Sequence, residues 1–164
     1  MDLFILRHGK AGESSTENND NTRTLTDGGR KEIKDIGRWM RKEKFRFDII
    51  ATSPLLRANE TAGIIARILD LKDKLEVWDE LAPGEDLDTI CYHAAQYGND
   101  ASILIVGHEP ALSGLVSRII SHGGTTSVSF AKGGLAKIRN FSFDREPSGD
   151  LQWLLTPKHM IVKR

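Results

Sequence analysis

The tripeptide Arg7-His8-Gly9 places a guanidinium, an imidazole and a flexible turn directly after the apolar segment 3–6. An unprotonated imidazole is a nucleophile, and a guanidinium binds oxyanions through two parallel N–H donors. The apolar segment is too short for a helix and is typical of a buried strand that Gly9 ends. Because ligands of open α/β sheets bind at strand ends, we expect these residues to bind and attack a phosphoryl group.

A second histidine occupies the same kind of position. His108 follows the apolar segment 102–106 and Gly107, and Pro110 is suited to the first turn of a helix. We expect that helix to extend over 110–121, so that His108 lies beside backbone N–H groups that favour anions. If protonated, His108 is a further positive contact for a phosphoryl group, and the bound anion raises its pKa.

Arg57 is a third candidate for binding an anion. It follows the apolar residues 49–51 and lies in the first turn of a predicted helix. A cation there is opposed by the helix dipole, so an anionic ligand explains its position. The alternative is a surface ion pair with Glu60 or Glu80.

Four short motifs resemble those of the histidine phosphatase superfamily. They are R-H-G at 7–9, L-T-x-x-G at 25–29, S-P-x-x-R-A-x-x-T-A at 53–62 and G-H-x-P at 107–110. The resemblance extends from residue 2 to about residue 120. A short chain without a large insertion is most similar to the SixA-type phosphohistidine phosphatases.

The resemblance implies a phosphoglycerate mutase-like fold and a phosphatase that carries the phosphoryl group on His8 before water releases it. Arg7, Arg57 and His108 complete the phosphate site. The second ring nitrogen of His8 is expected to bond to a backbone carbonyl near Gly9, which fixes the tautomer. Since four cationic groups take the place of a divalent metal in this scheme, we expect no metal and no other cofactor.

The general acid is sought among carboxylates, because many relatives have one after the third strand. Glu80 is the candidate, and Asp79, Glu85 and Asp86 compete with it. A solvated loop carboxylate is the alternative for Glu80. Residues 10–13 lack the Glu-Thr pair of many small-molecule members, which suits a substrate with an easier leaving group, such as phosphohistidine.

Other basic residues receive no role in the site. Arg23 and Lys10 are close to the motifs in sequence, and we expect them to be solvated or weak substrate contacts. His93, His122 and His159 lack a glycine turn.

Composition narrows the possible classes of protein. Lys+Arg and Asp+Glu both number 23, and this zero net charge argues against nucleic-acid binding through bulk charge. The length of 164 residues predicts one domain over 1–164, and 39% hydrophobic and 28% charged content is ordinary for a soluble globular protein. A single cysteine, Cys91, excludes an internal disulfide, and no Cys/His metal motif is visible. Since no segment resembles a signal peptide or a membrane span, the default location is cytoplasmic.

Strand and helix signals alternate along most of the chain. Strands are expected at 3–6, 48–51, 75–78 and 102–106, and helices at 27–42, from after Pro54 to about 69, at 87–97 and at 110–121. After residue 124 the pattern changes to strands at 127–130, 135–141 and 151–155, with a turn at 147–149. This order predicts an α/β fold of three layers, α/β/α, with a mostly parallel sheet and antiparallel strands added late.

The substrate is inferred from what could cover the site. Only residues 10–24 and the loop around Pro83-Gly84 are available, and a shallow pocket admits a phosphorylated protein side chain while binding small esters weakly. We therefore expect a phosphoprotein, and among these a phosphohistidine domain. A broad small-molecule phosphomonoesterase and a phosphate- or phosphoprotein-binding module without turnover remain alternatives.

Overall fold

A six-stranded mixed sheet forms the centre of the computed structural model, which describes residues 1–13 and 19–162. The strand order is β3-β2-β4-β1-β5-β6. The first four strands are parallel, β5 is antiparallel to β1, and β6 is antiparallel to β5. The strands are β1 (Asp2–Arg7), β2 (Ile49–Thr52), β3 (Leu75–Val77), β4 (Ser102–Gly107), β5 (Leu135–Phe143) and β6 (Pro147–Leu155).

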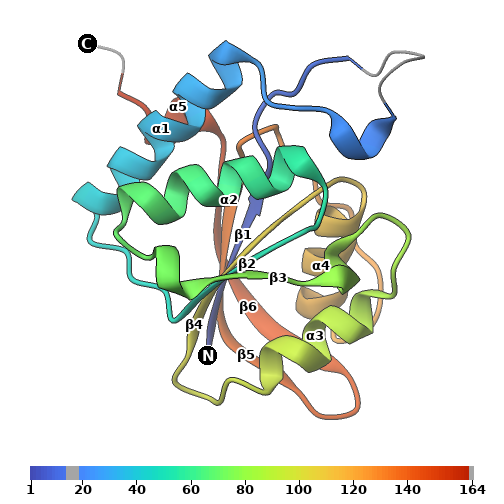
Figure 1. Ribbon diagram of the computed structural model, residues 1–164. Coiled ribbons are helices and arrows are strands. Elements are labelled where there is room, and N and C mark those ends of the chain that lie inside the picture. The colour runs from blue at the N-terminus through green and yellow to red at the C-terminus, as the bar shows by residue number, and fades with distance from the viewer. Residues whose placement is uncertain (14–18, 163–164) are drawn as a thin grey trace.

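Helices cover both faces of this sheet, so the predicted three-layer α/β/α fold is confirmed (Figure 1). Alternate residues of each central strand point to opposite faces: Leu3 and Ile5 join a core with α3 and α4, whereas Phe4 and Leu6 join a core with α1 and α2. The helices are α1 (Asp27–Lys42), α2 (Leu56–Ile68), α3 (Leu87–Ala95), α4 (Ala111–Ile120) and the short α5 (Pro157–Met160). No helix among the described residues combines the length and apolarity that crossing a membrane requires.

Most expected elements agree with the structure within two residues. Thr26 caps α1 as predicted, its hydroxyl accepting a hydrogen bond from the Gly29 N–H at 3.0 Å. The helix after His108 begins at Ala111, with Pro110 at the N-cap instead of in the first turn.

The late part of the chain corrects two expectations. Residues 127–130 form no strand: the Phe130 side chain is buried in the core, and its carbonyl accepts from Arg7 Nη1 at 2.8 Å instead of joining a strand pair. The turn expected at 147–149 lies at 144–146. Pro147 begins β6, an edge strand whose first position tolerates a residue without an N–H.

The strand order brings the predicted site together. Strands β2, β4 and β1 are parallel neighbours, with Thr52 opposite Val106 and Arg7 opposite Gly107. Their carboxyl ends therefore meet at one edge of the sheet. The residues that follow them, 53–57, 108 and 8–9, lie where ligands of open α/β sheets bind.

Candidate active site

His8 is held in one tautomer at the end of β1. Its Nδ1 donates to the Gly9 carbonyl at 2.7 Å, which confirms the expected backbone partner. The lone pair is therefore on Nε2, which accepts from Arg57 Nε at 3.3 Å. Burial, followed by the nearby charges of Arg57, Arg7 and Arg23, lowers the pKa of His8 to about 4, although the Gly9 bond opposes this. At neutral pH the ring is uncharged and its Nε2 lone pair is free of a proton.

Arg57 lies buried in the first turn of α2, with 5% of its surface exposed. Besides His8, its guanidinium binds Asp20, with Nη1 donating to the backbone carbonyl at 2.7 Å and Nη2 to Oδ2 at 3.1 Å. The alternative, a surface ion pair with Glu60 or Glu80, is not found among the described residues, where Glu60 pairs with Arg30 at 3.3 Å and Glu80 pairs with His93. An anionic partner thus accompanies this cation, as its place at a helix start suggested.

Arg7 and His108 each present a buried nitrogen to the same edge of the sheet. Arg7 Nη1 donates to the Phe130 carbonyl at 2.8 Å, and His108 Nε2 lies 2.7 Å from Ser53 Oγ. Arg7 Nε and His108 Nδ1 are the two buried side-chain polar atoms without a partner among the described residues. Leaving such a group unpaired costs about 1–3 kcal/mol, so the pair indicates a site made for a polar ligand.

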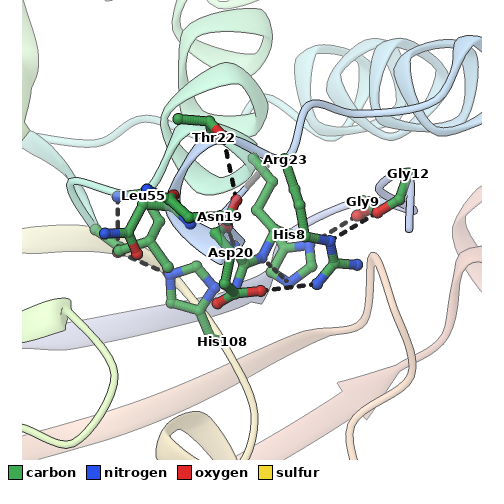
Figure 2. Close-up of polar contacts among 12 residues, drawn as sticks. His8, Gly9, Gly12, Asn19, Asp20, Thr22, Arg23, Leu55 and His108 are labelled. Carbon is green, nitrogen blue, oxygen red and sulfur yellow. Dashed lines mark hydrogen bonds and ion pairs between the residues drawn. The ribbon is translucent and has the colours of Figure 1, made fainter. Parts of the chain in front are cut away.

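The two imidazoles lie side by side, with ring centroids 5.1 Å apart, and both are labelled in the close-up of the site in Figure 2. Burial, Arg57 and His8 lower the pKa of His108 to about 3, although the Asp20 carboxylate opposes them. His108 is therefore neutral before an anion binds. The expected set of four cationic groups is corrected to two guanidiniums and two neutral imidazoles.

A hydroxyl on α2 braces the site from behind. Thr61 Oγ1 accepts from the Gly9 N–H at 3.2 Å and donates to the Arg57 carbonyl at 2.8 Å. Sequence reasoning included Thr61 and Ser53 in a motif but assigned them no role. For Thr61 the spacing could have indicated a role, because a residue four positions after Arg57 lies on the same face of the helix.

In the loop before α1, Asp20 was missed by sequence reasoning, and the expectation that Arg23 is solvated or a weak substrate contact is corrected. Asp20 begins a short 3₁₀ turn, and Arg23 holds it, with Nη1 donating to Asp20 Oδ1 at 3.0 Å. Arg23 Nε also donates to the Gly12 carbonyl at 2.7 Å, and its charge acts on His8. Arg23 therefore belongs to the electrostatic environment of the site. Residues 14–18 of the expected covering loop lie outside the described part of the chain.

Glu80 lies in the 3₁₀ turn Asp79–Leu81 and pairs with His93 of α3. The His93 ring stacks on Trp78, with centroids 3.9 Å apart. Among the described residues, no hydrogen bond or ion pair joins Glu80 to Arg7, His8, Arg57 or His108. The structure brings those four together and directs Glu80 elsewhere.

The three carboxylates that compete with Glu80 for the role of general acid have different surroundings. Asp79 shares the turn with Glu80, and Asp86 caps α3 through the Asp88 N–H at 3.1 Å. Glu85 borders a cavity of about 250 Å³ next to His108. Pro83, Leu87 and Pro110 make much of its wall apolar.

Comparison with known proteins agrees with this geometry. Residues 3–83 match the model of the histidine phosphatase superfamily (branch 1). The chain is 28% identical to the phosphohistidine phosphatase SixA of Escherichia coli (strain K12). The alignment covers 100% of this chain and 99% of that relative. It is also 30% identical, over 98% of this chain and 99% of the relative, to an uncharacterized protein of Picosynechococcus sp. (strain ATCC 27264 / PCC 7002 / PR-6).

A solved structure extends the similarity to three dimensions. The protein histidine phosphatase SixA complexed with tungstate superposes with a TM-score of 0.84 at 28% identity, covering 97% of this chain and 99% of that chain. Similarity of this extent, in sequence and in fold, is shared by proteins of one family. The chain therefore belongs to the histidine phosphatase superfamily and is a phosphatase of the SixA type.

Proposed function

We propose that the protein hydrolyses phosphohistidine on another protein through a phosphohistidine formed on its own His8. The observation that carries this proposal is the unprotonated Nε2 of His8, beside the Arg57 guanidinium and within a site whose Arg7 and His108 nitrogens lack partners. The SixA relative binds tungstate, which is a tetrahedral oxyanion like phosphate. The Escherichia coli relative is a phosphohistidine phosphatase.

The reaction proceeds in two displacements. His8 Nε2 forms a bond to phosphorus while the bond from phosphorus to the substrate nitrogen breaks, and that electron pair stays on the departing imidazole. Water then attacks the phosphorus, releases inorganic phosphate and returns the electron pair to Nε2. Arg7 and Arg57 stabilise the charge on the non-bridging oxygens in both steps.

His108 assists as a donor and does not need to be charged. Ser53 Oγ accepts from the Leu55 N–H at 3.2 Å and lies 2.7 Å from His108 Nε2, where its own proton can be donated to that nitrogen. This arrangement places the ring proton of neutral His108 on Nδ1, the atom without a partner. Nδ1–H is then a donor to a phosphoryl oxygen, and the anion raises the pKa of the ring.

The surroundings favour a leaving group that needs little help. An imidazole protonated on its other nitrogen departs as a neutral ring, whereas an alkoxide needs an acid. Glu80, the expected acid, is engaged by His93. The cavity of about 250 Å³ next to His108 offers a partly apolar surface for a departing ring.

Charge stabilisation by the guanidiniums supplies what a divalent metal supplies in other phosphoryl-transfer enzymes. We therefore propose that turnover is independent of metal. Activity unchanged after prolonged treatment with EDTA is the expected result, and activity that returns only on adding a divalent ion would contradict the proposal.

A substrate panel on the wild type and H8A tests the function. We expect phosphohistidine peptides to be turned over with a kcat/KM far above that of sugar phosphates, and H8A to lose at least about a thousandfold of the activity. Acid quenching would destroy the intermediate, so an alkaline quench should trap an acid-labile, base-stable phosphate on the wild type only. A preference for sugar phosphates by orders of magnitude would indicate a small-molecule phosphomonoesterase. Reversible phosphate binding without turnover would indicate a binding module.

A further inference from the structure

The Asp20 carboxylate already binds the guanidinium that the proposed reaction needs. Arg57 offers Nη1 to the Asp20 carbonyl at 2.7 Å and Nη2 to Asp20 Oδ2 at 3.1 Å. These two donors are the fork that binds two oxygens of a phosphoryl group. The same guanidinium contacts His8 Nε2 at 3.3 Å, and the Asp20 charge acts on His108, so the carboxylate lies beside the groups that would surround a tetrahedral oxyanion in the proposed reaction.

We propose that Asp20 is an internal competing anion that sets the affinity of the site for phosphoryl groups. A phosphoryl ligand must displace the Asp20 carboxylate from Arg57 before it can bind. This inference rests on the phosphoryl site of the proposed function, but it does not depend on which phosphorylated molecule is the substrate.

The surroundings of Asp20 hold its carboxylate on Arg57 and also allow it to be displaced. The Arg57 side chain is 6% exposed and is fixed by its helix, whereas the Asp20 side chain is 55% exposed and reaches in from a loop. Leaving Arg57 would not strand the carboxylate, because Arg23 binds its other oxygen at 3.0 Å. Asn19 Oδ1 accepts from the Asn21 N–H at 2.9 Å and maintains the turn independently of the Asp20 side chain.

The charge on Asp20 persists under working conditions. The hydrogen bond from Arg23, followed by the charge and hydrogen bond of Arg57, holds the pKa of Asp20 below its usual value. The carboxylate is therefore ionised throughout the neutral range and competes with phosphate as one anion with another.

The consequence is a uniform reduction in affinity. Every phosphoryl ligand, including the product phosphate, gives up the same Asp20–Arg57 contact, so the ratio of kcat/KM between two substrates does not change. Ligands that bring only a phosphoryl group are left weakly bound. A phosphorylated protein has further surface with which to offset the loss.

The test is oxyanion binding to D20N and D20A, measured by titration calorimetry with tungstate and with inorganic phosphate. Asn keeps the shape of the side chain and removes its charge, and in both variants the contact of Arg57 with the backbone carbonyl of residue 20 can remain. We expect both ligands to bind about three- to fivefold more tightly, as removal of one partly exposed ion pair allows. The KM for a phosphoramidate should fall by the same factor without a loss of kcat before product accumulates.

Asp35 provides the matched control. It is an aspartate of α1 that pairs with Lys31 at 2.9 Å and Arg38 at 2.7 Å, outside the site. D35N should leave oxyanion affinity unchanged. Equal tightening in D35N and D20N would overturn the proposal, because the cause would then be net charge.

Other outcomes separate Asp20 from different roles. Weaker or unchanged oxyanion binding in D20N would mean that Asp20 only positions Arg57. Unchanged binding with a large loss of kcat would make Asp20 catalytic, and both results overturn the inference. Because calorimetry needs no turnover, tighter binding by D20N together with no turnover of phosphohistidine would retain the role of Asp20 and reject the proposed substrate.

Discussion

The floor and the mouth of this site are built differently. The floor consists of Arg7 at the end of β1, the residues after β1, β2 and β4, and the first turn of α2. Most of its polar groups are buried and bonded to backbone or to one another, and among the described residues Arg7 Nε and His108 Nδ1 are left without a partner. The mouth consists of residues 19–23 and 79–87, where Asp20 is half-exposed and Pro83 to Glu85 are exposed. The difference teaches that the residues proposed to react lie on the rigid part of the fold, whereas the loops adjust the affinity for the phosphoryl group and the access of the substrate to the site.

The sharpest test of the floor is Arg57. R57A should lower kcat/KM by about a hundred- to a thousandfold, because it removes a buried donor pair that stabilises the transferring group. R57K should recover part of this loss, since it restores the charge but not the planar fork. Initial rates on a phosphohistidine peptide measure both variants.

R38A is the control for that experiment, because Arg38 is an exposed arginine of α1. It should leave the rates unchanged. If R57A were no worse than R38A, the site would not operate through its floor.

Buried neutral imidazoles make the floor sensitive to acid. The pKa of His8 is lowered from 6.5 to about 4 and that of His108 from 6.5 to about 3, so between these values the unfolded chain binds more protons than the folded one. The free energy of unfolding should therefore decrease as the pH drops below about 6.5. The shift of His8 alone should account for a loss of about 3 kcal/mol once the pH is below 4. Urea unfolding at several pH values and an NMR titration of both rings measure this effect.

Midpoints of His8 and His108 close to 6.5 would show that the floor does not keep them neutral.

Thr61 joins two parts of the floor, and its loss should have an intermediate effect. T61V keeps the shape but leaves the Gly9 N–H without its acceptor, so the variant should be destabilised by about 1–3 kcal/mol. Thermal unfolding measures this change. T61S restores the hydroxyl and should recover most of the loss, and a T61V protein as stable as the wild type would contradict the bracing role.

Glu80 tests the mouth, where we expect the smallest effect. E80Q should change turnover of a phosphohistidine peptide by less than about twofold, because the carboxylate is engaged by His93 and a protonated imidazole needs no acid to leave. Parallel assays with an alkyl phosphate show whether the acid matters for harder leaving groups. Loss of all turnover, including that of phosphoramidates, would refute the easy-leaving-group argument.

The same division separates what sequence reasoning could find from what it could not. Arg7, His8, Arg57 and His108 each follow a short apolar strand, so local pattern and the rule for parallel strands predicted that they meet. Asp20 and Arg23 approach from a loop whose path depends on contacts distant in sequence, such as the one from Asp20 to Arg57. No periodicity encodes such contacts.

The late strands show the same limit. Residues 127–130 alternate polar and apolar side chains as a strand does, but the Phe130 carbonyl bonds to the Arg7 side chain, a contact distant in sequence that the local pattern does not reveal. The strand at 151–155 was found but begins earlier, at Pro147, because its length is set by the pairing with β5 and not by its own composition.

One consequence concerns the start of α2. Because Thr61 bonds both the turn after His8 and the backbone of Arg57, the proposed nucleophile and the proposed oxyanion-binding group are held by one helix. An added Cβ on Gly37 of α1 would lie 2.9 Å from Ile68 Cδ1 on α2, so a larger residue at this position must push the Ile68 side chain aside. The packing of α1 against α2 therefore affects the position of Arg57 and of the turn after His8. Substitutions at this helix contact offer a way to change activity while His8 and Arg57 themselves stay the same.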